Sequence, residues 1–89
     1  MTNPEIIITH EDDNWTCGHI GGFDFEVKHW PEPSIFGIES GDEPGRISKL
    51  WIARRGTYGV FAAYDRGWDK LPRTDNEIEI TQAIIDRFN

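Results

Sequence analysis

The sequence contains one cysteine, few basic residues and no long hydrophobic run. A single cysteine excludes an intramolecular disulfide and is typical of a reducing compartment. No apolar segment approaches the roughly 20 residues that a membrane-spanning helix requires. The first residues, M-T-N-P-E, lack the basic start and apolar core of a signal peptide. These absences predict a cytoplasmic protein with no membrane association.

Basic residues are outnumbered by acidic ones, nine against 16, which gives a net charge of -7. This balance argues against general nucleic-acid binding, which depends on Lys and Arg to neutralise phosphates. Acidic positions are spread through the N-terminal half, at 11–13, 24, 26, 32, 39, 42 and 43. Such a half could occupy a basic groove of a partner protein as a nucleic-acid mimic does. The alternative is that the charge serves only solubility.

Aromatic residues are the main resource for a core. A chain of 89 residues forms one domain, 1–89, and buries a thin core. Four Trp, five Phe and two Tyr compensate, because each aromatic buries a large area. The chain contains no internal repeat and no Walker, Rossmann or EF-hand pattern.

Two strands around Gly21-Gly22 form the clearest structural prediction. Trp15–Ile20 and Phe23–Trp30 are strands, and two glycines at the turn favour a two-residue hairpin. A strand is also predicted at 5–9, followed by an acidic turn at 11–14. The hairpin register predicts the facing pairs Ile20–Phe23, Gly18–Phe25 and Thr16–Val27 on one face, and His19–Asp24, Cys17–Glu26 and Trp15–Lys28 on the other.

A second hairpin is predicted from Arg46–Ala53 and Tyr58–Tyr64, with Arg55-Gly56 as its loop. The predicted facing pairs are Leu50–Phe61, Ser48–Ala63, Ile52–Gly59, Ile47–Tyr64, Trp51–Val60 and Arg46–Asp65. Both faces of this hairpin are apolar, which predicts a central position covered on both sides. If only one side is covered, the hairpin carries an exposed aromatic patch.

The C-terminal segment is predicted to be a helix. Thr74 and Glu77 match a capping box, with Asn76 and Glu79 as an alternative, and a late start is possible because I-E-I-T also suits a strand. Its apolar stripe contains Ile80, Ala83, Ile84 and Phe88, with Ile85 at the edge. Segment 34–39 is predicted to be extended or an edge, and 40–45 a loop. The fold class is therefore α+β, an antiparallel sheet of four or five strands with one C-terminal helix on a face.

Three stretches carry a resemblance to known proteins. S-I-F-G-I-E at 34–39, G-R-I-S-K-L-W-I at 45–52 and Y-D-R-G-W-D at 64–69 resemble a family of small uncharacterised proteins found in bacteriophages, prophages and Firmicute-type bacteria. Segment 41–44 makes the loop longer than is usual in that family. The resemblance implies a phage-type accessory protein in a bacterial host cell, and it implies no activity, cofactor or functional residue.

The most organised surface is the end of the second hairpin. Arg provides a planar donor fork, Trp and Tyr are typical binding anchors, and Asp provides acceptors. The predicted binding residues are Trp51, Tyr64, Asp65, Arg66, Trp68 and Asp69. The alternative is that Arg46 and Arg66 neutralise Asp65 and Asp69 within a structural turn.

Metal binding is the second hypothesis. Cys17, His19, Asp24 and Glu26 share one face in the predicted register, with His10 and His29 as possible additions, although paired metal-binding spacings such as C-x-x-C are absent. Glu26 and Lys28, downstream of Asp12 and Asp13, also resemble weakly the D…E-x-K arrangement of Mg²⁺ nucleases.

Taken together, these features lead us to predict a non-enzymatic protein-binding module without a cofactor. A small metal-dependent enzyme and a self-associating scaffold are the alternatives.

Overall fold

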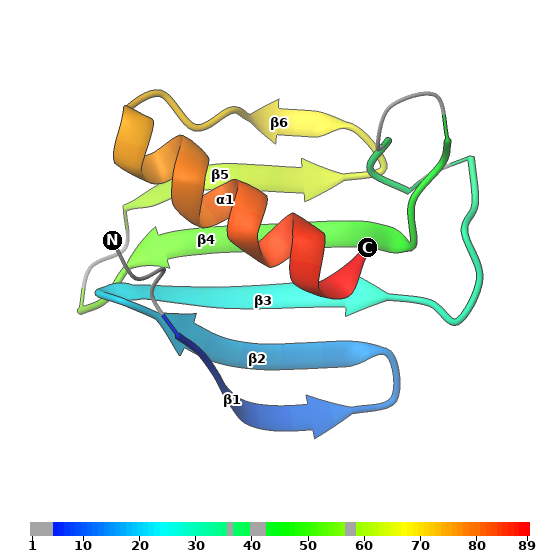
Figure 1. Cartoon of the computed structure of the whole chain (residues 1–89), viewed down its shortest axis with the longest axis horizontal. Helices are drawn as coiled ribbons and strands as arrows, with labels where there is room; N and C mark the ends of the chain where they lie inside the picture. Colours follow the sequence, from blue (N-terminus) through cyan, green and yellow to red (C-terminus); the bar gives the residue numbers. More distant parts are fainter. Residues whose placement is uncertain (1–4, 36, 40–42, 57–58) are drawn as a thin grey trace.

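The computed structural model describes residues 5–35, 37–39, 43–56 and 59–89. In these ranges the chain forms one antiparallel sheet with a single helix on one face (Figure 1). Each strand pairs with the next along the chain, so the sheet is a meander. The elements are β1 (Ile6–Asp12), β2 (Trp15–Ile20), β3 (Phe23–His29), β4 (Ile47–Arg54), β5 (Val60–Asp65), β6 (Trp68–Lys70) and α1 (Asp75–Phe88).

The predicted antiparallel sheet with a C-terminal helix is confirmed, but the predicted number of strands is wrong. The described residues form six strands rather than four or five. β6 was missed because it has three residues, all exposed, and so offers no alternation to detect. The segment at 34–39, predicted to be extended or an edge, forms no strand in its described part, and Phe36 lies outside the described residues.

The first hairpin has the predicted register. All six predicted pairs between β2 and β3 are present, from Trp15–Lys28 to Ile20–Phe23. The Gly-Gly turn works as expected, with Gly21 at a φ of 58°. The predicted acidic turn is shorter than expected, because β1 continues to Asp12. Asp13, with a φ of 51°, makes the reversal into β2, and Asp tolerates this left-handed conformation better than most residues.

The predicted register of the second hairpin is wrong. Leu50 faces Tyr64 rather than Phe61, a displacement of three positions, and Lys49 rather than Arg46 faces Asp65. The cause is the loop, since β4 ends at Arg54 and β5 begins only at Val60. Within that loop, 57–58 lie outside the described residues. The observed pairs are Lys49–Asp65, Leu50–Tyr64, Trp51–Ala63, Ile52–Ala62 and Ala53–Val60.

The capping box at the start of α1 is confirmed. Thr74 Oγ1 accepts a hydrogen bond from the N–H of Glu77 at 3.1 Å, and Glu77 Oε1 accepts one from the N–H of Thr74 at 3.1 Å. These bonds satisfy backbone donors that a helix leaves unpaired at its N-terminus. The alternative cap at Asn76 and a late helix start are therefore wrong, and α1 begins at Asp75.

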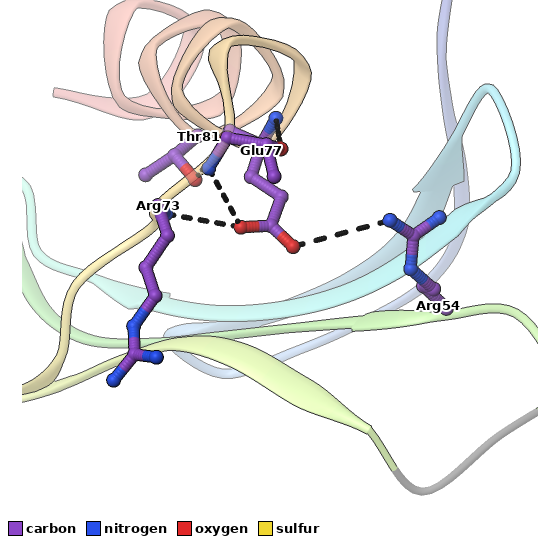
Figure 2. Close-up of polar contacts among 5 residues, drawn as sticks. Arg54, Arg73, Glu77 and Thr81 are labelled. Atoms are coloured by element: carbon purple, nitrogen blue, oxygen red, sulfur yellow. Dashed lines mark hydrogen bonds and ion pairs between the residues drawn. The ribbon is translucent and has the colours of Figure 1, made fainter.

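Glu77 also connects the helix to the sheet. Its Oε1 accepts a hydrogen bond from the N–H of Arg73 at 3.0 Å, and its Oε2 lies 4.0 Å from Arg54 at the end of β4 (Figure 2). The backbone hydrogen bonds from Arg73 and Thr74 lower the pKa of the Glu77 carboxyl, and Arg54 adds to that effect. The first turn of α1 is thus held in place over β4.

The core lies between α1 and one face of the sheet. The helix crosses β3, β4 and β5 (Figure 1), and it buries Ile80, Thr81, Ile84, Ile85 and Phe88. The predicted stripe is therefore confirmed, with Ala83 partly buried. The sheet contributes Ile20, Phe23, Phe25, Val27, Ile47, Leu50, Ile52, Ala62 and Tyr64. Among the described residues, no helix is long and apolar enough to cross a membrane.

The prediction that the second hairpin is covered on both sides is wrong. α1 covers one face, and the opposite face, which we call the open face, has no described element packed on it (Figure 1). Trp51 in β4 points to this face and is 38% exposed. The predicted alternative, an exposed aromatic patch on the second hairpin, is the one that applies.

Candidate functional site

The open face is built by the residues that alternate with the core. On β3 the core residues Phe25 and Val27 are interleaved with Glu26 and Lys28, which point the other way. Because the strands are in register, these residues form rows across the sheet. One row is Asp12, Trp15, Lys28, Lys49 and Asp65, and the next is His10, Cys17, Glu26, Trp51, Ala63 and Lys70.

Two neighbouring hollows lie on this face. The first, which we call the acidic hollow, has a volume of about 270 Å³. Its lining combines two Trp side chains with three carboxylates: Trp15, Glu26, Lys49, Leu50, Trp51, Ala63, Tyr64, Asp65 and Asp69. The second, the basic hollow, has a volume of about 310 Å³ and is lined by Lys28, Trp30, Ser34, Ser48, Lys49 and Arg66. Lys49 lines both hollows, so the two are adjacent.

Four of the six predicted binding residues line the acidic hollow: Trp51, Tyr64, Asp65 and Asp69. Arg66 lines the basic hollow instead. Trp68 packs edge-on against Tyr64, with ring centres 5.2 Å apart and planes at 73°. The predicted group is therefore brought into one neighbourhood but does not form one surface.

Tyr64 belongs to the core as well as to the hollow, since it is 8% exposed. Its burial raises the pKa of the phenol, and the nearby charge of Glu39 raises it further. Asp65 is exposed and lies 3.9 Å from Lys49, its partner across the strands. The predicted pairing of Asp65 with Arg46 is replaced by this contact, because the register differs.

Sequence reasoning missed the contribution of Lys49 and Trp30. Lys49 received no predicted partner, because the two-residue loop assumed for the second hairpin paired Asp65 with Arg46 instead. Trp30 precedes Pro31, where the ladder was expected to end, yet its N–H still donates to Arg46 O at 3.0 Å. The alternation on β3 was the available signal, since it already placed Trp30 on the same face as Lys28.

The predicted metal residues lie on the open face as expected. Cys17 and His19 are on β2, and each faces its predicted partner on β3, Glu26 and Asp24. Asp24 lies 3.9 Å from Arg55, which partly neutralises the charge of the carboxylate. Within the described ranges, no three or more His, Cys, Asp and Glu side chains gather closely enough to hold a metal ion. Burial raises the pKa of the Cys17 thiol, and the charge of Glu26 raises it further.

His29 cannot join that group. Its Nε2 lies 3.0 Å from Thr16 Oγ1, and its ring packs on Phe88 of α1 at a centre distance of 5.1 Å. It therefore lies on the helix side of the sheet, where burial lowers its pKa. The residues of the nuclease-like arrangement are not brought together either. Asp12 is separated from Lys28 by the strand β2, and Asp13 lies in the turn between β1 and β2.

Comparison with known families gives a match over most of the chain. Residues 14–89 match a family described as a domain of unknown function (DUF7678), which covers more than half of the chain. The chain belongs to the DUF7678 family. The DUF7678 match contains β2 to β6 and α1, whereas β1 lies before it. No curated protein and no solved structure matches this DUF7678 chain.

Proposed function

We propose that this DUF7678 chain is a non-enzymatic protein-binding module that presents the open face to a partner protein. The observation that carries the proposal is Trp51. It lies on β4 in the middle of the sheet, borders the acidic hollow and is 38% exposed. Large exposed aromatic patches on soluble proteins usually mark interaction surfaces, and Trp is enriched among residues that dominate binding energies.

The charges around Trp51 define the partner's chemistry. Glu26, Asp65 and Asp69 line the same hollow, and Lys49 is its single base among the described lining residues. We therefore expect the partner to insert an apolar side chain against the Trp rings and to carry Lys or Arg beside it. Complementary charge steers such an encounter, and the net charge of -7 adds to this attraction.

The resemblance to phage and prophage proteins supports a cytoplasmic role in a bacterial host. Inhibition of a host defence enzyme or a nucleic-acid enzyme is one concrete form of this role. Such enzymes have basic grooves that bind phosphates. An acidic surface with exposed aromatic anchors is suited to fill one.

Two tryptophans provide a matched test. Trp51 and Trp68 have nearly the same exposure, 38% and 37%, but Trp68 packs against the core residue Tyr64. Trp51→Ala and Trp68→Ala are prepared, and their folding is checked by circular dichroism and thermal unfolding. In affinity capture from host lysate, the wild type and Trp68→Ala should retain one shared partner, which Trp51→Ala loses by at least tenfold. Equal capture by both variants would contradict a binding role of the open face.

The alternative occupant of the open face is a second copy of this chain. Light scattering of the purified chain distinguishes it, because a dimer that becomes monomeric on Trp51→Asp would assign the face to a second copy. A monomeric wild type that loses its partner on Trp51→Ala supports the proposal instead.

A further inference from the structure

The basic hollow gathers a large share of the few basic residues of this chain. Lys and Arg number nine against 16 acids, yet three of the nine, Lys28, Lys49 and Arg66, line this hollow. No carboxylate occurs among the described residues that line it. Electrostatic interactions are screened beyond about 8 Å at physiological ionic strength. Groups near the hollow therefore matter more than the net charge of the chain, and besides the three cations they include Asp65, which lies 3.9 Å from Lys49 but does not line the hollow.

Lys28 and Lys49 are held directly opposite each other. They face across β3 and β4 in the ladder, and both point to the open face. Facing residues have Cβ atoms about 4.5–5.5 Å apart, and like charges in such a pair are destabilising. Lys28 makes no ion pair with a described carboxylate, and its ammonium lies 5.1 Å from the ring centre of Trp30 and 5.7 Å from that of Trp15. An anion between the two ammonium groups would turn this repulsion into attraction.

The third cation is placed by the backbone. Arg66 has a φ of 59°, an uncommon conformation for a residue with a side chain. Its N–H donates to Ser48 O at 3.0 Å, which fixes the turn beside β4. A guanidinium presents several donors in a planar fork and matches the oxygens of a phosphate.

Neutral groups complete the hollow. Trp30 Nε1 donates to Ser48 Oγ at 2.9 Å, which orients the indole. A hydroxyl that accepts this bond still has its own proton to donate. Ser34 supplies a second hydroxyl to the lining. The hollow thus combines three cationic groups, hydroxyl donors and an aromatic surface that is 40% exposed.

We infer that the basic hollow is a binding site for the phosphate group of a phosphomonoester. A phosphomonoester carries a charge of about −1.5 to −2 at pH 7 and three strong acceptor oxygens. A carboxylate offers less charge and only two acceptor oxygens to the same three cationic side chains. The volume, about 310 Å³, leaves room for an organic substituent beside Trp30. This inference does not depend on the proposed partner, because it concerns a different hollow and is tested on the purified chain.

The test is an NMR titration with phenyl phosphate, inorganic phosphate and acetate at constant ionic strength and pH 7.5. The expected result is a saturable shift of the amides at 28–30, 48–49 and 66 and of the Trp30 indole. We expect phenyl phosphate to bind more tightly than inorganic phosphate, and acetate at least tenfold more weakly than either. Equal binding of acetate would contradict a site selective for phosphate. Non-saturable shifts, or shifts centred on the start of α1 at 74–77, would overturn the site itself.

Substitutions locate the site independently. Arg66→Asn removes the cation and keeps a residue that tolerates positive φ, and Lys49→Gln keeps the length of the side chain. Each should weaken phenyl phosphate at least tenfold. Arg73→Gln is the control, since Arg73 is an exposed base that precedes α1. If Arg73→Gln weakens binding as much as Lys49→Gln, the effect is general screening and the inference fails. If Arg66→Asn does not fold, Lys49→Gln decides.

Discussion

The side-chain oxygen of Asn89 accepts a hydrogen bond from the backbone N–H of Arg46 at 2.8 Å. The same oxygen lies 3.3 Å from the N–H of Ile47, and the amide nitrogen donates to Ile38 O at 3.1 Å. One side chain at the C-cap of α1 therefore connects the helix to the start of β4 and to the segment before it. A Cβ on Gly45 would come within 2.1 Å of this oxygen, so only glycine leaves it room.

Asn89→Ala should lower the free energy of unfolding by about 1–3 kcal/mol, because it leaves backbone groups without a partner. Urea denaturation followed by Trp fluorescence measures this change. Asn76→Ala is the matched control, since Asn76 is exposed on the first turn of α1, and it should change stability by less than about 0.5 kcal/mol. A similar loss in both variants would assign the effect to the helix rather than to the Asn89 contacts.

Gly18 should not tolerate a side chain. A Cβ at this position would lie 2.1 Å from Ile7 O and 3.0 Å from the ring of Phe25. Gly18→Ala is therefore expected to cost about 1–3 kcal/mol through overpacking, measured by thermal unfolding. Gly22→Ala is the control, because a Cβ at Gly22 has no atom within 4 Å and its φ is not positive. That variant should be neutral or slightly stabilising.

Glu77 should contribute to the acid sensitivity of the fold. Its carboxyl has a lowered pKa in the folded state because backbone N–H groups of Arg73 and Thr74 bond the charged form. The stabilisation is therefore fully present above the ordinary Glu pKa of about 4.3 and is lost as the pH falls through the lowered value. Glu77→Gln should show a flatter stability profile than the wild type below about pH 4.3. Parallel profiles in acid denaturation would contradict this assignment.

Cys17 should react slowly with thiol reagents. Burial and the facing charge of Glu26 raise its pKa, so less thiolate is present at a given pH. We expect alkylation by iodoacetamide at pH 8 to be several-fold slower than for a free thiol. Glu26→Gln should accelerate it, whereas Asp69→Asn, a change on β6, should not. An unchanged rate in Glu26→Gln would leave burial as the sole cause.

The two hairpins show where sequence reasoning succeeded and failed. Gly21-Gly22 defines a two-residue turn, and the register of β2 and β3 follows from it. Arg55-Gly56 offers a similar local signal, but β5 begins only at Val60. The observed partners of Leu50, Trp51 and Ile52 are each displaced by three positions from the predicted ones. A turn signal predicts where a chain reverses more reliably than how many residues the reversal takes.

The site was predictable only in part for the same reason. Alternation on β3 placed Glu26 and Lys28 on one face without any knowledge of the second hairpin. The pairing of Lys28 with Lys49 depends on the contact between β3 and β4. Seventeen residues lie between the end of β3 at His29 and the start of β4 at Ile47. No local pattern specifies such a contact. The helix, in contrast, followed from its own capping box at Thr74.

β1 pairs with β2 alone, extends beyond the area that α1 crosses and is exposed at every position except Ile6 (Figure 1). Its register with β2 is interrupted between Ile8 and His10. Detachment of β1 therefore costs less than detachment of any strand beneath the helix. Detachment would make β2 the edge strand of the sheet, with unpaired backbone donors and acceptors that another strand can bind. Two molecules that release β1 together could each donate Ile6–Asp12 to the other, which makes this strand the element most suited to exchange between chains.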